Sequence, residues 1–282
     1  MGIIYLSLSA CGGIHTRQAL DHIAAAGIKH VELAIGVKPD ADAAAAVADY
    51  RAAGTMFRAH HAFVWESEHR PFNLARTLDL DYFQRSIEWL AKMDITAYSV
   101  HPGSYTANYE AAWELFLTNL EWLSKLCASH KIELGVETMY PIRNENRRYF
   151  LDNLESIDAL KQSLPNLKWV LDLAHLNLWQ EHRLEAINLL GDCLLEIHIS
   201  DNDGRRDLHT AVSNKTWWLP YLELLPTSVP YVLETRLAPM RSDEPMVAAS
   251  KIASEYHRVS QLLKMLDYST SPAAIQDHNC PV

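Results

Sequence analysis

Carboxylate and imidazole side chains recur where the apolar runs of this chain end. Six residues close such runs and three more follow in the next segments: His60, His101, Glu137, Asp172, His198 and Glu234, then His175, Asp207 and His209. Oxygen and nitrogen donors of these kinds are the protein ligands of hard or borderline divalent cations. An unpaired carboxylate inside an apolar run is costly to bury, and a bound cation removes that cost. The pattern therefore predicts a divalent metal site.

These candidates need elements that bring distant parts of the sequence together. Eight short runs of β-branched or apolar residues are predicted strands, at 3–8, 30–35, 56–61, 96–101, 132–138, 168–173, 194–200 and 229–235. Amphipathic segments are predicted helices, at 15–26, 41–53, 79–93, 109–130, 153–162, 176–190, 217–225 and 243–266. Strand alternating with helix predicts a parallel sheet with both faces covered, and right-handed connections favour a (β/α)8 TIM barrel. The carboxyl ends of all its strands, and with them the candidate ligands, would share one face.

The alternative to a barrel is an open, doubly wound sheet, but no GxGxxG or GxxxxGK[ST] motif follows any predicted strand. The 282 residues would allow two domains, yet no Pro/Gly/Ser tract, low-complexity block or charge run separates them. We therefore expect one domain over residues 1–266. Residues 267–282 contain two prolines and little periodicity, which predicts a C-terminal tail.

The net charge and the lack of targeting signals limit the binding partners and the cellular location that we expect for this protein. The formal net charge of −10 argues against a protein that holds duplex DNA, because phosphate contacts need Lys and Arg. The N-terminus lacks a signal peptide, and no window reaches the roughly 18 consecutive apolar residues of a membrane span. The four cysteines are far apart and form no CxxC, which is typical of reduced thiols in a cytoplasmic protein.

Six motifs together carry a family resemblance: HHAF at His60, HPG at His101, GVET at Glu137, DLAH at Asp172, HISDNDGRRDLH at His198 and LET at Glu234. In this order and spacing, the chain resembles the xylose isomerase-like TIM barrels over roughly residues 1–266. That superfamily joins sugar (phosphate) isomerases and epimerases to the type-IV apurinic endonucleases. Adjacent His60 and His61 compete for one position, and the spacing to Phe63 favours His60.

The resemblance implies one to three bound ions, of zinc or manganese. In the isomerases, the residues matching Glu137, Asp172, His198 and Glu234 hold one cation. The endonucleases hold three zinc ions. There the residues matching His60, His101 and Glu137 bind one ion, the isomerase set binds the second, and those matching His175, Asp207 and His209 bind the third. This sequence has a candidate at all nine positions.

These sequence features leave three candidate functions for the protein. The leading one is a metal-dependent isomerase or epimerase acting on a small sugar or related polyol, with Glu137 and Glu234 as the acid/base pair. Arg236 suits a phosphate or carboxylate, and Tyr140 could stack on a sugar face. The alternative is a zinc phosphoesterase of the apurinic endonuclease type. It is disfavoured by the charge and by the run HTAVSNKTWW, which lacks the glycine of the endonuclease pattern. A non-catalytic sugar-binding barrel is the third. Self-association into a homo-oligomer stays open.

Overall fold

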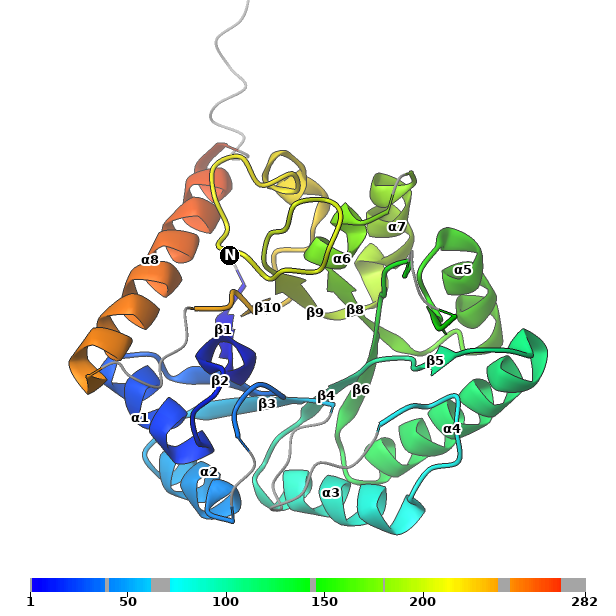
Figure 1. The fold of residues 1–282 in the computed structure, drawn as a ribbon, viewed down its shortest axis with the longest axis horizontal. Coiled ribbons are helices and arrows are strands. Elements are labelled where there is room, and N and C mark those ends of the chain that lie inside the picture. Colours follow the sequence, from blue (N-terminus) through cyan, green and yellow to red (C-terminus); the bar gives the residue numbers. More distant parts are fainter. Residues whose placement is uncertain are drawn as a thin grey trace, which may run out of the picture.

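A closed barrel of eight parallel strands forms the centre of the molecule (Figure 1). The computed structural model describes residues 2–38, 41–61, 72–142, 146–179, 181–237 and 244–269. The strands follow the order β1-β10-β9-β8-β6-β4-β3-β2 around the barrel. They are β1 Ile4–Ser7, β2 His30–Leu33, β3 Met56–His60, β4 Ala97–Val100, β6 Glu133–Glu137, β8 Lys168–Asp172, β9 Leu194–Ile199 and β10 Tyr231–Leu233. The predicted TIM barrel is confirmed, and each strand lies within its expected range.

Helices surround the barrel on its outer side (Figure 1). They are α1 Thr16–Ala25, α2 Ala43–Ala52, α3 Leu80–Lys92, α4 Tyr109–Ser129, α5 Leu154–Ser163, α6 Leu173–Asn177, α7 Arg183–Leu190 and α8 Pro245–Ser269. Three short 3₁₀ segments are η1 Leu8–Cys11, η2 Gly191–Cys193 and η3 Leu219–Leu224. Polar N-cap residues determine where several helices begin. The side chains of Asp79 and Asn153 accept hydrogen bonds from the backbone amides of Tyr82 in α3 and Ser156 in α5.

Two helix predictions were wrong. The predicted helix 176–190 is two helices, because Asp172 already starts α6 by accepting the amides of Ala174 and His175. The chain then breaks before α7, where His182 takes a left-handed conformation with φ 64°. The predicted helix 217–225 is the 3₁₀ segment η3, with Pro220 in its first turn. A two-stranded antiparallel sheet of β5 Ser104–Tyr105 and β7 Arg148–Tyr149 was not expected, because dipeptides are too short to show a period.

The C-terminal boundary differs slightly from the prediction. Helix α8 continues to Ser269, beyond the expected end at residue 266. The rest of the expected tail, 270–282, lies outside the described residues. Within the described part of the chain, no helix has the length and apolar character needed to cross a bilayer.

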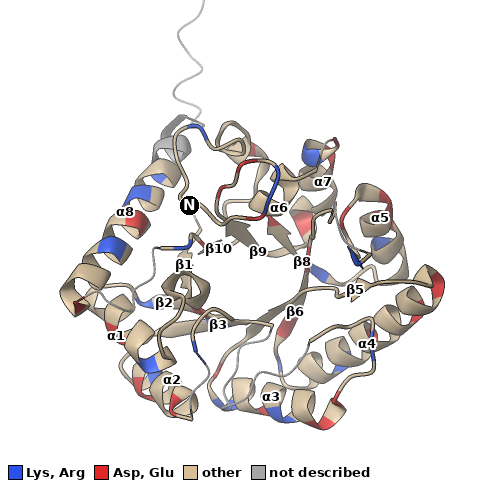
Figure 2. Ribbon diagram, viewed as in Figure 1, with Lys and Arg blue, Asp and Glu red and all other residues tan. Residues whose placement is uncertain are grey.

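The barrel strands are buried almost throughout, as both their faces are covered: every residue of β1, β4 and β9 is buried. Charged side chains nevertheless lie inside the barrel, among them Glu32, Arg58 and Glu196. On the outer helices, acidic and basic positions are interspersed (Figure 2). Cys11, Cys127 and Cys193 are free thiols, and Cys280 lies outside the described residues.

Candidate metal centre

Four neighbouring strands place ligand-type side chains at one end of the barrel. Glu137 and Asp172 are the last residues of β6 and β8, His198 is near the end of β9, and Glu234 directly follows β10. The parallel register pairs Asp172 with His198, so these two lie side by side at one height. All four are buried, with exposures of 1%, 1%, 0% and 6% in chain order.

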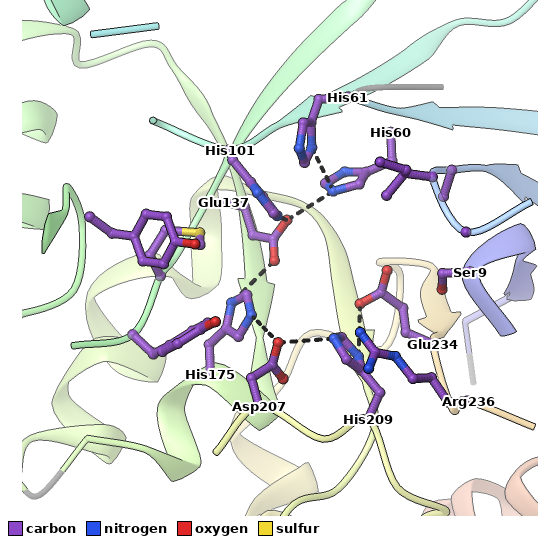
Figure 3. Close-up of a pocket in the computed structure, with 16 residues that line it drawn as sticks. Ser9, His60, His61, His101, Glu137, His175, Asp207, His209, Glu234 and Arg236 are labelled. Atoms are coloured by element: carbon purple, nitrogen blue, oxygen red, sulfur yellow. Dashed lines mark hydrogen bonds and ion pairs between the residues drawn. The ribbon is translucent and has the colours of Figure 1, made fainter. Parts of the chain in front are cut away.

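Glu137 is at the centre of the cluster and faces four imidazoles, of which Figure 3 shows those of His60, His101 and His175. Its Oε2 lies 3.1 Å from His101 Nε2, 3.4 Å from His60 Nε2 and 3.8 Å from His198 Nδ1. Its Oε1 lies 3.2 Å from His175 Nδ1. Strands β3 and β9, helix α6 and the residue directly after β4 thus all direct a histidine toward the end of β6.

Asp207 and His209 complete the cluster from the loop after β9. Asp207 Oδ2 lies 3.0 Å from His209 Nε2 and 3.6 Å from His175 Nε2. Glu234 Oε2 lies 3.5 Å from His198 Nδ1 and 3.8 Å from His209 Nδ1. His209 takes a left-handed backbone conformation, with φ 49°. All nine candidates from the sequence therefore meet in one cluster.

His61 also belongs to this cluster, although the sequence favoured its neighbour. His61 Nδ1 lies 2.9 Å from His60 Nε2, and the His61 ring is 3.8 Å from the ring of His101. Of the two neighbours, His60 is the one that lies against Glu137, with its Nε2 3.4 Å from Oε2. The choice of His60 as ligand stays a prediction, and Phe63, on which it rested, lies outside the described residues.

Unpartnered polar atoms test whether these residues fit a cation. Within the described residues, Glu137 Oε2, Asp172 Oδ2 and His198 Nδ1 are buried and make no hydrogen bond. Ligand atoms of these same three residues lie within 4.8 Å of one another. Buried carboxylate oxygens and ring nitrogens that make no hydrogen bond are unfavourable, and a divalent cation would satisfy all three together. The donor set of carboxylates and imidazoles fits zinc or manganese.

The pKa values in the cluster follow from burial opposed by neighbouring charges. Burial raises the pKa of Glu137, but His101 and His198 outweigh burial and hold it well below its usual range. Burial also opposes ionisation of Glu234, yet His198 lowers its pKa to about 2. Burial lowers the pKa of His60 to about 4. Both glutamates are therefore ionised at neutral pH, and His60 is neutral and able to bind a metal.

The sequence missed a layer of charged residues beneath the cluster. His198 Nε2 lies 3.3 Å from both Glu32 Oε2 and Glu196 Oε1. The Arg58 guanidinium pairs with Glu196 and donates to the Leu195 carbonyl at 3.2 Å. Carboxylates against Nε2 leave Nδ1 of His198 directed at Glu137 and Glu234. The alternation in LLEIHI, which puts Glu196 and His198 on one side of the strand, is the signal that could have found Glu196.

A cavity of about 280 Å³ adjoins the cluster. Its wall includes both predicted substrate-binding residues, Arg236 and Tyr140, and also Ser9 and Tyr149, which the sequence did not single out. The Tyr140 ring lies 4.8 Å from the ring of His175 and 5.5 Å from that of Tyr149. The cavity therefore joins ionised groups, imidazoles and aromatic faces, which suits a small polar substrate.

Comparison with known proteins agrees with this fold. The family model of the xylose isomerase-like TIM barrel matches residues 20–228, and the chain belongs to that family. Among solved structures, a D-tagatose 3-epimerase-like protein has a TM-score of 0.73 at 15% identity, covering 96% of this chain and 100% of that one. D-psicose 3-epimerase from Clostridium cellulolyticum H10 has a TM-score of 0.64 at 14% identity, with 93% and 99% covered.

A third similar structure is 3-keto-D-glucoside 4-epimerase from E. coli, with a TM-score of 0.63 at 15% identity over 92% of this chain and 100% of that one. At these identities, the likeness is one of fold. No curated protein matches the sequence significantly.

Proposed function

We propose that this protein is a metal-dependent isomerase or epimerase acting on a sugar or a sugar-like carbonyl compound or polyol. One observation carries the proposal. Glu137 and Glu234 line one cavity and are both held ionised. Beside them, the buried potential metal ligands Asp172 Oδ2 and His198 Nδ1 make no hydrogen bond with the described residues. The names of the similar structures, a D-psicose 3-epimerase and a 3-keto-D-glucoside 4-epimerase among them, support sugar chemistry at such a site.

The two glutamates act as the acid/base pair. Strands β8 and β9 separate β6 from β10, so Glu137 and Glu234 approach the cavity from different parts of the rim. One carboxylate takes the proton from the carbon next to the substrate carbonyl, and the C–H electron pair moves toward the carbonyl oxygen. The other returns a proton to carbon. A bound divalent cation supplies polarisation of the carbonyl, which a carboxylate of low pKa needs from its surroundings.

The ions would be held as the family resemblance implies. Glu137, Asp172, His198 and Glu234 would hold the first, and His60 and His101 a second together with Glu137. A third would use the remaining set of His175, Asp207 and His209. Zinc and manganese both suit these ligands. The free thiols of Cys11 and Cys127 support a reducing compartment, and we place the enzyme in the cytoplasm.

Solvent isotope exchange tests the proposal. Purified protein loaded with Mn²⁺ in deuterated water should introduce deuterium next to the carbonyl of at least one ketose in a panel followed by NMR. Glu137→Gln and Glu234→Gln should lower the exchange rate by about 10²–10⁴-fold, because each removes a proton-transfer group. Glu223→Gln, at an exposed position in η3, should keep the wild-type rate. Exchange that survives both cavity substitutions would contradict the assignment.

One observation favours a second function, a multinuclear zinc phosphoesterase: all nine residues that match the endonuclease ligands lie in one cluster. The net charge of −10 and the interspersed charges of the outer helices oppose a duplex DNA substrate (Figure 2). We expect no incision of an abasic-site duplex by zinc-loaded protein. Incision that is lost in Glu234→Gln would reverse the ranking.

A further inference from the structure

The cavity has two chemically different ends (Figure 3). At one end lie Ser9, Gly36 and Arg236, which follow the adjacent strands β1, β2 and β10. His175 lies across the cavity from Arg236 in Figure 3, and the Tyr140 ring lies 4.8 Å from the His175 ring, with the Tyr149 ring 5.5 Å from that of Tyr140. The candidate ligands Asp207 and His209 lie between His175 and Arg236 in Figure 3. A substrate that spans the cavity would meet the positively charged guanidinium of Arg236 on one side and the aromatic rings of Tyr140 and Tyr149 on the other.

Arg236 is the only Lys or Arg among the described residues that line the cavity. Its side chain is exposed, and its guanidinium makes no hydrogen bond or ion pair with any described residue. Its backbone is fixed, because the Arg236 N–H donates to the His209 carbonyl at 2.8 Å. Glu234, the nearest acid in sequence, lies against His198 and His209 instead.

Several other arginines of this acidic chain are paired, two of which serve as examples. Arg17 binds Asp42 and Asp49, and Arg258 binds Glu255. A guanidinium that has no partner among the described residues and lies beside a polar cavity has donors available for a ligand. Its planar fork fits the oxygens of a carboxylate or phosphate, and neutral hydroxyl groups do not balance its charge.

We propose that the substrate carries an anionic group, a carboxylate or a phosphate ester, which Arg236 binds at its end of the cavity. The substrate class is then a sugar acid or a sugar phosphate rather than a neutral ketose. Ser9, half-buried on the same wall, adds a hydroxyl beside the anion. The sugar carbons lie over the ligand cluster, with Tyr140 and Tyr149 at their far end. This inference rests on the proposed isomerase or epimerase function.

Matched substrates test the inference. Deuterium exchange is measured with D-fructose, D-fructose 6-phosphate and D-fructuronate, which separate a neutral sugar from its phosphate and its acid. We expect kcat/KM to be higher for one of the anionic compounds than for D-fructose. Arg236→Met should lower that kcat/KM by about 10- to 100-fold, mainly through KM, since a charge-assisted hydrogen bond is lost. Arg236→Lys should recover part of it. Arg76→Met, an exposed arginine outside the cavity, should have no effect.

Binding of unreactive polyols gives a readout independent of catalysis. Calorimetry should find D-glucitol 6-phosphate or D-gluconate bound more tightly than D-glucitol, with the preference lost in Arg236→Met. Equal kcat/KM for neutral and anionic sugars, unchanged in Arg236→Met, would overturn the inference and leave the proposed function intact. If no sugar exchanges deuterium, the proposed function fails, and an absent polyol preference would then overturn the anion site separately.

Discussion

The two ring nitrogens of His198 face different carboxylates. Nδ1 points at Glu137 and Glu234, while Nε2 lies 3.3 Å from Glu32 and Glu196. Carboxylates that accept the second N–H of a metal-binding histidine fix its tautomer and orientation, and their loss typically costs about 10–100-fold in metal affinity. Glu32 is the simpler probe, because Glu196 also pairs with Arg58, whereas the ion pair that Glu32 forms among the described residues is the one with His198.

We therefore predict that Glu32→Leu keeps the fold but weakens metal binding by about 10–100-fold. The apolar side chain should not destabilise the barrel, because burial already raises the pKa of Glu32 to about 7 and His198 Nε2 keeps its hydrogen bond with Glu196. Competition titration of Co²⁺ against a chelator, read by cobalt absorption, measures the affinity. Glu133→Gln, at an exposed position of β6, serves as control. Unchanged affinity in Glu32→Leu would remove Glu32 from the account.

Asp207 reports how many ions are bound. It contacts His175 and His209, and these two histidines hold its pKa far below the usual range, so it is a ready anionic ligand. Elemental analysis of saturated, desalted protein should give two or three equivalents of metal. Asp207→Ala should lose about one of them. A single equivalent in both proteins would leave Asp207 outside the metal centre.

The metal-ligand candidates were predictable because each stands in a motif at the end of an apolar run. Glu32 and Arg58 were not, because one acid or base in a four- or five-residue strand looks like a solvent-facing position. Only the closed barrel shows that these positions point inward, where Glu32 stands beside Arg58 in the register of β2 and β3. The preference for His60 over His61 used spacing alone, which does not reveal that both rings reach one cluster.

At the scale of elements, Gly103 sets the path of the chain after β4 and His101. It adopts φ +98°, and a Cβ there would meet the Asn73 side chain and lie 2.9 Å from the Leu74 amide nitrogen. Asn73 Oδ1 in turn accepts the amides of Ala75 and Ser104. Gly103→Ala should lower the free energy of unfolding by about 1–3 kcal/mol, measured with urea. Gly191→Ala has open space at Cβ and should change it little. Equal effects would show that the turn is not constrained.

Strands were easier to predict than helices in this chain. Each barrel strand is covered on both faces, so its sequence is a short, almost continuous apolar run between turn residues, and such a run is easy to recognise. The α6–α7 break has no such signal, because apolar residues such as Leu178 and Trp179 continue across it. Asp172 sets the start of α6, whose first amides its carboxylate accepts, and the break itself lies before α7, where His182 has φ 64°.

At the scale of the whole molecule, the metal-free protein should lose stability as pH rises. Burial opposes protonation of His175, His198 and His209, but adjacent carboxylates outweigh it and raise their pKa values above 6.5. Stability from these protons is complete below the unfolded value of about 6.5 and is lost as pH rises through the folded pKa. His60 acts oppositely. Its pKa is lowered to about 4, so its contribution is lost as pH falls from 6.5 toward 4.

Urea unfolding at pH 6.5 and pH 9, with and without chelator, measures this linkage. Chelated protein should be less stable at pH 9 than at pH 6.5, and saturating Zn²⁺ should reduce the difference, because metal binding favours the deprotonated histidines. Chelated protein that is as stable at pH 9 as at pH 6.5 would contradict the assigned pKa directions.

The most direct test of the central claim follows one preparation through removal and return of its metal. Deuterium exchange into the best sugar of the panel is measured on protein as purified, after prolonged chelation, and after stepwise addition of Mn²⁺, Co²⁺ or Zn²⁺. We predict that chelation abolishes exchange, that an added divalent cation restores it, and that Asp172→Ala recovers nothing at the same metal concentration. Full exchange by protein shown by elemental analysis to be metal-free would contradict a metal-dependent isomerase or epimerase.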